Sequence, residues 1–211
     1  MKITKLGHCC LIIEEKGLRI MTDPGAWSTA QNDQKNIHLV LITHEHPDHF
    51  HLDSLKTVLT NNSQAQVITN SAVGKLMDEV GIKYQLLEHG ESKQVNGMNF
   101  EGYGQEHAII YENIGQVLNT GFMIGDRLFY PGDALYNPKR PVEILALPVA
   151  GPWVKISEAI DYAKELKPKY AFPVHDGLLK IYSGHHTVPQ RVLPECGIDF
   201  KVLEELKEYE Y

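Results

Sequence analysis

The segment LITHEHPDHF, residues 41–50, places three histidines and one aspartate within six positions, namely His44, His46, Asp48 and His49. The preceding run HLVLIT (38–43) is almost wholly apolar and predicts a central strand buried on both faces. Neutral imidazole and carboxylate groups are the usual ligands of zinc and related divalent metals. One ion cannot easily take four ligands from six residues, whereas two neighbouring ions can share them. The segment therefore predicts a two-metal site at a strand end.

A two-metal site needs further ligands, and three more polar residues follow predicted strands. His107 lies in EGYGQEHA, Asp133 in RLFYPGDA and His175 in YAFPVHDG. Taken singly, a loop histidine or a Gly-Asp turn is common. Because all three come directly after strands, we expect them to converge with the cluster at one site.

The order of predicted elements indicates the layers of the fold. Alternation and turn residues predict strands within 2–43, 66–70, 84–104, 117–133, 143–149, 170–175 and 198–206, with the Gly-Asp pair at 125–126 as a hairpin turn. Helical spacing predicts helices over 51–60, 71–81 and 157–166, the last capped by Ser157. In each half of the chain, a part rich in hairpins leads into a part where strands and helices alternate. This order predicts two sheets packed face to face with helices outside, in one domain spanning 1–211.

Composition excludes several classes of function. The 211 residues carry 27 acidic and 20 basic side chains, a net charge of −7, and no Lys/Arg cluster that would follow a phosphate backbone. We therefore expect a small-molecule substrate and no long nucleic acid.

No apolar run is long enough to span a membrane, and the first residues lack the pattern of a signal peptide, so we expect no membrane partner and a cytoplasmic location. A homo-oligomer is compatible with the sequence. Cys9, Cys10 and Cys196 form no CxxC pair and are odd in number, which favours reduced thiols. Cys9 and Cys10 lie in a predicted strand, where we expect buried core thiols.

The motif His44-x-His46-x-Asp48-His49, followed in order by the three later residues, resembles the metallo-β-lactamase superfamily of metal-dependent hydrolases. The segments LGHCCLIIE (6–14) and PVHDG (173–177) are similar to the compact, stand-alone branch that includes the ascorbate-6-phosphate lactonase. The resemblance implies an α+β fold, a four-layer αββα sandwich with the site along one edge. It implies that the first metal is held by His44, His46 and His107, the second by Asp48, His49 and His175, with Asp133 bridging.

What the resemblance implies for activity is hydrolysis with two divalent ions, zinc first and manganese or iron as alternatives. Two ions sharing one water lower its pKa from ~15.7 toward ~7, so that a metal-bridged hydroxide can attack a small ester, lactone or phosphodiester. Asp48 and Asp133 are the candidate catalytic carboxylates, as metal ligands and proton acceptors. The alternative is a mononuclear iron oxidoreductase on the same scaffold, similar to a sulfur dioxygenase. A non-catalytic scaffold protein is disfavoured, because seven polar groups aimed at one point are costly without a ligand.

A second group of residues has a role that the sequence leaves open. Asp23, in the TDP turn, either orients a ligand histidine or only forms the turn. The general acid, if one exists, is His8, His185 or His186, although the segment KIYSGHHTVP (180–189) also fits a surface loop. In GPWVK (151–155), Trp153 and Lys155 either contact substrate, with Lys155 binding an anion, or serve packing.

Overall fold

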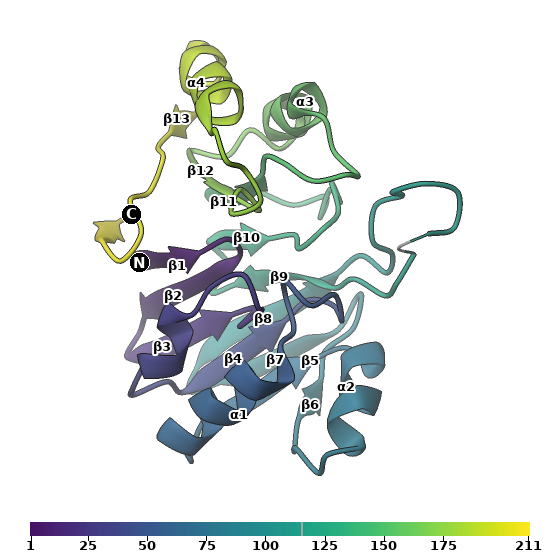
Figure 1. The fold of residues 1–211 in the computed structure, drawn as a ribbon. Coiled ribbons are helices and arrows are strands. Elements are labelled where there is room, and N and C mark those ends of the chain that lie inside the picture. The colour runs from purple at the N-terminus through teal and green to yellow at the C-terminus, as the bar shows by residue number, and fades with distance from the viewer. Residues whose placement is uncertain (115) are drawn as a thin grey trace.

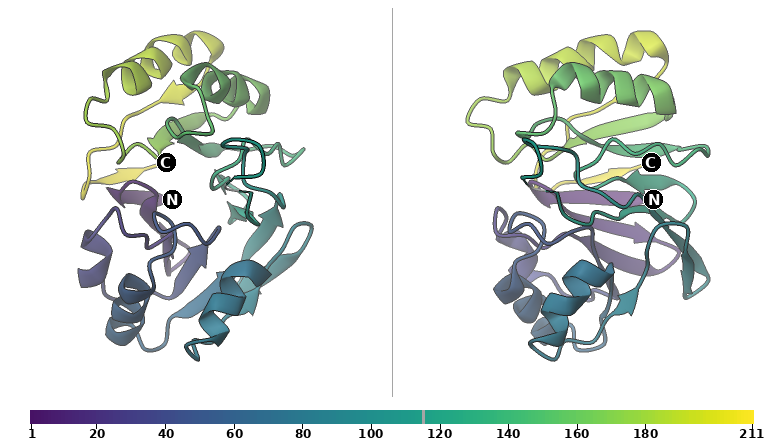
Figure 2. Two further views of the ribbon diagram at one scale, coloured as in Figure 1. Left: turned by 45° about the vertical axis from the view of Figure 1, so that its right-hand side comes forward. Right: turned by 90° about the vertical axis from the view of Figure 1, so that its right-hand side faces the viewer.

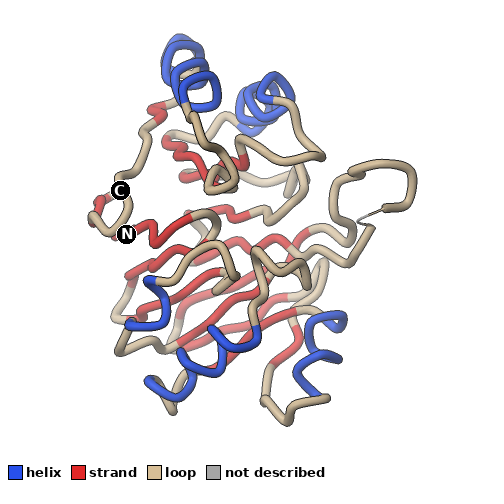
Figure 3. The backbone as a smooth tube through the Cα atoms, viewed as in Figure 1, coloured by secondary structure: helices blue, strands red, loops and turns tan. Residues whose placement is uncertain are grey.

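The computed structural model describes residues 1–114 and 116–211 as two mixed seven-stranded sheets packed face to face, with helices on the outer face of each (Figures 1 and 3). This is the αββα sandwich that the sequence predicts. The strands of the first sheet are, in spatial order, β14 (Glu208–Glu210), β1 (Lys2–Gly7), β2 (Cys10–Glu15), β3 (Leu18–Thr22), β4 (Leu39–Ile42), β5 (Gln66–Thr69) and β6 (Gln85–Leu86). Those of the second sheet are β13 (Asp199–Phe200), β12 (Tyr170–Val174), β11 (Ile144–Pro148), β10 (Leu128–Tyr130), β9 (Gly121–Ile124), β8 (Met98–Tyr103) and β7 (Ser92–Val95).

The helices lie in two outer layers, one against each sheet (Figure 2). On the first sheet lie α1 (Leu52–Asn61) and α2 (Ser71–Asp78), with a short 3-10 turn, η1 (Ala30–Asp33). On the second lie α3 (Ile156–Leu166) and α4 (Ser183–Val192), the latter followed by η2 (Pro194–Cys196). Among the described residues, no helix is long and apolar enough to cross a bilayer.

Strand β4 shows why the apolar run before the histidine cluster forms the centre of a sheet. All four of its residues are fully buried, and they alternate between two cores. Leu39 and Leu41 pack between the two sheets, whereas Val40 and Ile42 pack against α1 and α2. Because both faces are apolar and β4 pairs in parallel with β3 and β5, its carboxyl end is held rigidly.

Strand direction brings the predicted site residues to one edge of the sandwich. In the first sheet β3, β4 and β5 are parallel neighbours. In the second, β10, β11 and β12 are parallel, and β8 runs the same way because both β8 and β10 pair antiparallel with β9. The loops that follow β3, β4, β8, β10 and β12 therefore emerge together, as the loops after parallel strands do in other α/β sheets.

Three expectations about local structure are wrong. Ser157 does not cap α3, because the helix already begins at Ile156 and its cap residue is Lys155, whose backbone N–H binds the Glu158 carboxylate. The histidine-rich segment near 183 is helix α4 rather than a loop, although Pro189 lies inside it. The closing strand predicted over 198–206 shrinks to β13, and the chain then returns to the first sheet as β14, which pairs with β1.

Candidate metal centre

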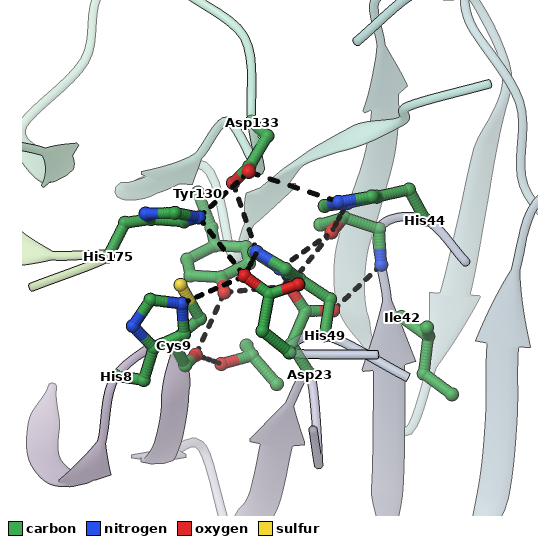
Figure 4. A network of polar contacts seen from close by, with 12 residues as sticks. His8, Cys9, Asp23, Ile42, His44, His49, Tyr130, Asp133 and His175 are labelled. Carbon is green, nitrogen blue, oxygen red and sulfur yellow. Dashed lines mark hydrogen bonds and ion pairs between the residues drawn. The ribbon is translucent and has the colours of Figure 1, made fainter. Parts of the chain in front are cut away.

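The structure brings all seven predicted ligands together at the shared sheet edge. Figure 4 shows four of them, His44, His49, Asp133 and His175, directed toward one another. Two groups have ligand atoms that lie within 4.8 Å of one another: one group is His44, His46 and His107, and the other is Asp48, His49, Asp133 and His175. The residues come from loops after β4, β8, β10 and β12, as the sequence predicts. The grouping matches the division between two ions that the family resemblance implies.

Asp133 lies between the two groups. Its Oδ2 is 2.8 Å from Nε2 of His175, 3.3 Å from Nε2 of His107 and 4.0 Å from Nε2 of His44. Its Oδ1 is 3.0 Å from Nε2 of His49. The carboxylate therefore faces histidines of both groups at once, which is the position of a bridging ligand.

The backbone of the Asp133 loop is fixed by Asn119 and Gly132. The Asn119 side chain accepts from the Asp133 N–H at 3.0 Å and donates to the Pro131 carbonyl at 2.9 Å. Gly132 has φ +66°, and a Cβ there would lie 2.3 Å from Asn119 Oδ1 and 2.9 Å from Thr43 Cβ. Only glycine lets this loop approach the end of β4 so closely.

Trp153 orients the Asp133 carboxylate itself. Its indole N–H donates to Asp133 Oδ2 at 2.9 Å, and the ring lies between those of His107 and His175, with centroids 5.7 Å from each. The side chain is buried. Trp153 therefore lines the cavity over the site, where one interpretation of the sequence placed it beside the substrate. The sequence did not reveal its hydrogen bond to Asp133. Lys155 is exposed at the start of α3 and does not line the pocket over the site.

Asp23 is the buried anchor of the cluster loop, and it contacts His49, a predicted ligand, as one of the two interpretations of the sequence expects. Its Oδ2 is 2.7 Å from Nδ1 of His49 and accepts from the hydroxyls of Thr43 (2.8 Å) and Tyr130 (2.7 Å). Its Oδ1 accepts from the Thr43 N–H at 2.8 Å. Asp23 is fully buried and has φ +37°, a conformation kept only where surrounding contacts enforce it.

These contacts fix which ring nitrogen of each histidine is available. His49 donates from Nδ1 to Asp23, and His107 donates from Nδ1 to the Ala108 carbonyl. The Thr43 hydroxyl gives its proton to Asp23, so it accepts from Nδ1 of His44 at 2.9 Å. In all three rings Nε2 is left as the lone-pair atom, which is how metal-binding histidines are oriented.

The loop carrying Asp48 is pressed against the turn that carries Asp23. A Cβ on Gly25 would lie 1.8 Å from the Asp48 carbonyl oxygen, and the Ala26 N–H donates to the Pro47 carbonyl at 2.8 Å. The TDPG turn therefore sets both the backbone and one histidine of the cluster. This close contact requires glycine at position 25.

His8 positions Asp48. The Gly177 N–H donates to Nδ1 of His8 at 3.1 Å, so Nε2 carries the proton and donates to Asp48 Oδ2 at 3.2 Å. Of the other two candidate acids, His186 binds the Asp176 carboxylate at 2.8 Å, and neither His185 nor His186 lines the pocket over the site. The structure thus places only His8 of these three beside the clustered ligands.

Electrostatics at the site favour a bound cation. Burial lowers the pKa of His44 well below its usual value and keeps this imidazole neutral. Burial, the largest single influence, lowers the pKa of His49 and His175, but the neighbouring acidic groups, Asp133 first and then Cys9, together outweigh it. They raise the pKa of His49 well above normal and that of His175 to about 10. The carboxylates therefore draw positive charge to their side of the site. Cys9 lies in the same buried group as His8, His49 and His175, although the sequence indicated only a core thiol.

The donor set fits divalent metal binding. Among the described residues, six buried polar atoms at this site make no contact with hydrogen-bond geometry: Nε2 of His44, His49 and His107, both ring nitrogens of His175, and Oδ1 of Asp133. Nε2 of His49 and of His175 lie close to the Asp133 carboxylate but not in that geometry. Buried polar atoms are normally satisfied, and a metal ligand is the role that explains imidazole nitrogens converging on carboxylates. The residues present therefore match the metal requirement that the sequence predicts.

Comparisons with known proteins agree with this geometry. The family described as "Beta-lactamase superfamily domain" matches residues 2–175. Protein Rv0786c of Mycobacterium tuberculosis is 33% identical over 97% of both chains, and a UPF0173 metal-dependent hydrolase of Carboxydothermus hydrogenoformans is 27% identical over 83% of this chain and 84% of its own. The solved structure of Igni18, a metallo hydrolase from Ignicoccus hospitalis, covers 100% of this chain and 98% of its own, with a TM-score of 0.79 and 20% identity.

Proposed function

The chain belongs to the metallo-β-lactamase superfamily and is a metal-dependent hydrolase, and from this premise we propose that it uses two divalent metal ions to hydrolyse a small ester, lactone or phosphodiester. The observation that carries the proposal is the position of Asp133 between two ligand groups, with one oxygen 3.0 Å from His49 and the other 3.3 Å from His107. A single ion would leave one group unsatisfied.

In this proposal the first ion is held by His44, His46 and His107, and the second by Asp48, His49 and His175, with Asp133 shared. Zinc is the first choice for such nitrogen and oxygen donors, and manganese or iron are alternatives. When bound, the ions supply Lewis acidity and a water of lowered pKa.

The protein's own groups would do the positioning. Trp153 and Asn119 keep Asp133 facing both ligand groups, and Asp23 keeps Nε2 of His49 directed at the site. His8 holds Asp48 by donating to it. Apolar side chains around the site exclude bulk water, which strengthens every charge interaction inside.

Metal analysis combined with an activity screen tests the proposal. The metal-free protein would be loaded separately with zinc, manganese and iron, its metal content measured by elemental analysis, and lactones, thioesters and phosphodiesters assayed. We expect two ions per chain and hydrolysis of at least one class. One iron per chain with oxygen-dependent turnover would instead favour the mononuclear oxidoreductase.

Matched variants locate the activity. His46→Ala and Asp133→Ala should each lose metal and abolish hydrolysis, whereas His185→Ala, on α4 away from the ligand groups, should keep both. Unchanged turnover in Asp133→Ala would refute the two-metal proposal.

A further inference from the structure

The cavity directly above the ligand groups is small and has apolar walls. Its volume is about 250 Å³. Five candidate metal-centre residues form its floor: His46, Asp48, His107, Asp133 and His175. The rest of the lining is Trp27, Pro47, Ile110, Pro152, Trp153 and Leu178.

Ligand clefts for drug-sized molecules are typically about 300–1,000 Å³. The site cavity therefore suits a small substrate.

No lysine or arginine lines this cavity among the residues that the structure describes. The buried Lys5 is not available, because its Nζ is paired with the Asp176 carboxylate. Proteins that bind phosphate esters usually offer arginine forks or lysines to the oxygens that do not react. Here those oxygens would face apolar walls, and only the metal centre could balance the charge.

Two large apolar side chains at the mouth are left partly open to solvent. Trp27, on the loop after β3, is 52% exposed although its ring packs on that of His8, with centroids 4.7 Å apart. Leu178, on the loop after β12, is 41% exposed. Both line the same cavity, so an apolar group of a substrate would cover them and gain affinity by leaving water.

We infer that the substrate is a small uncharged carboxylic ester, thioester or lactone whose apolar group packs against Trp27 and Leu178. Its carbonyl is the one polar group that must reach the metal centre, and the remainder matches the walls. The inference rests on the proposed function and narrows it, because phosphodiesters are excluded as the preferred class.

A series of acyl esters tests the inference on the metal-loaded protein. The probes are the p-nitrophenyl esters of acetate, butyrate and hexanoate, with bis-p-nitrophenyl phosphate as the anionic comparison. We expect kcat/KM to rise about threefold to fourfold per methylene, from about 0.8 kcal/mol per buried CH₂, and the phosphodiester to be the poorest substrate. The inference would be overturned if kcat/KM did not depend on the length of the acyl chain, or if the phosphodiester were preferred over every ester. The proposed hydrolase function would stand in either case.

Variants at the mouth provide a second readout. Leu178→Ala should flatten the dependence on chain length, and Leu178→Lys should shift the ratio of kcat/KM toward the phosphodiester by about tenfold. Ile181→Lys is the matched control, because Ile181 lies three residues further along the chain, is 73% exposed and does not line the cavity. An equal shift in Ile181→Lys would assign the effect to general surface charge and overturn the role of Leu178. Absence of hydrolysis with every probe and metal would overturn the proposed function, and this inference with it.

Discussion

The first sheet supplies four of the seven predicted ligands from one loop after β4, whereas the second supplies one from each of three loops, after β8, β10 and β12. The single loop is held by one buried carboxylate, Asp23, and by the close contact at Gly25. The three dispersed ligands need separate supports, such as Asn119 for Asp133. Ligands that share one loop can therefore be held by one anchoring residue. Ligands on separate loops each need an anchor of their own.

The largest effect should come from the residue that both ligand groups share. Asp133→Asn keeps the shape but removes the charge, so we expect both ions to bind more weakly and kcat/KM to fall by at least about 10³-fold. His46→Ala should weaken only one ion. Metal titration followed by elemental analysis distinguishes the two variants, and loss of a single ion in Asp133→Asn would show that the two groups are independent.

The next effect tests the shared anchor of the cluster loop. Asp23→Asn leaves His49 and the Thr43 and Tyr130 hydroxyls without their charged acceptor. We expect metal affinity to fall about 10- to 100-fold and the free energy of unfolding to fall by about 2 kcal/mol. Competition with a chelator and denaturant titration measure these quantities. Unchanged metal affinity would mean that the cluster loop holds its shape without Asp23.

A smaller effect tests one of the dispersed supports. Trp153→Phe keeps an aromatic wall but removes the N–H that binds Asp133 Oδ2. Losing one hydrogen bond to a carboxylate costs about 1.5 kcal/mol, so we expect kcat/KM to fall about tenfold and the thermal stability to fall modestly. Steady-state kinetics and a thermal melt provide the check; a fall in stability without a fall in kcat/KM would assign Trp153 to packing alone.

The smallest effect lies away from the metal centre, on an ion pair of the second sheet. Arg127 binds Glu143 through two hydrogen bonds of 2.7 and 2.8 Å, which lower the pKa of the Glu143 carboxyl. A lowered pKa stabilises the fold above the pKa of the unfolded chain, and this contribution disappears as the pH falls through the folded value. Glu143→Gln should therefore cost about 0.5 kcal/mol at pH 7 and less at about pH 4, where part of the contribution is already lost. Denaturant titrations at both pH values measure this difference, and equal costs would exclude a charge effect.

The sequence predicted the cluster loop better than its supports, for a physical reason. Ligands at close spacing after an apolar strand can be recognised from the local sequence. The three later ligands could be assigned to the same site because the ends of the strands before them meet at one edge. The Trp153–Asp133 and Asn119–Asp133 bonds join residues 20 and 14 positions apart on different loops, so no local pattern reveals them. Helix α4 was missed because histidines, Gly184 and Pro189 weaken its helical pattern. Strand β14 was missed because three residues are too few for a periodicity to register.

The pairing of β14 with β1 has a consequence for how the protein is made. Lys2 lies opposite Glu210, and the Met1 amino group donates to the Tyr211 carbonyl at 2.9 Å. During synthesis β1 is made before β14, so this edge of β1 stays uncovered until residues 208–210 have left the ribosome. Such a distant pairing closes a very long loop, so we expect it to form late in folding, after the cluster loop already has its local contacts.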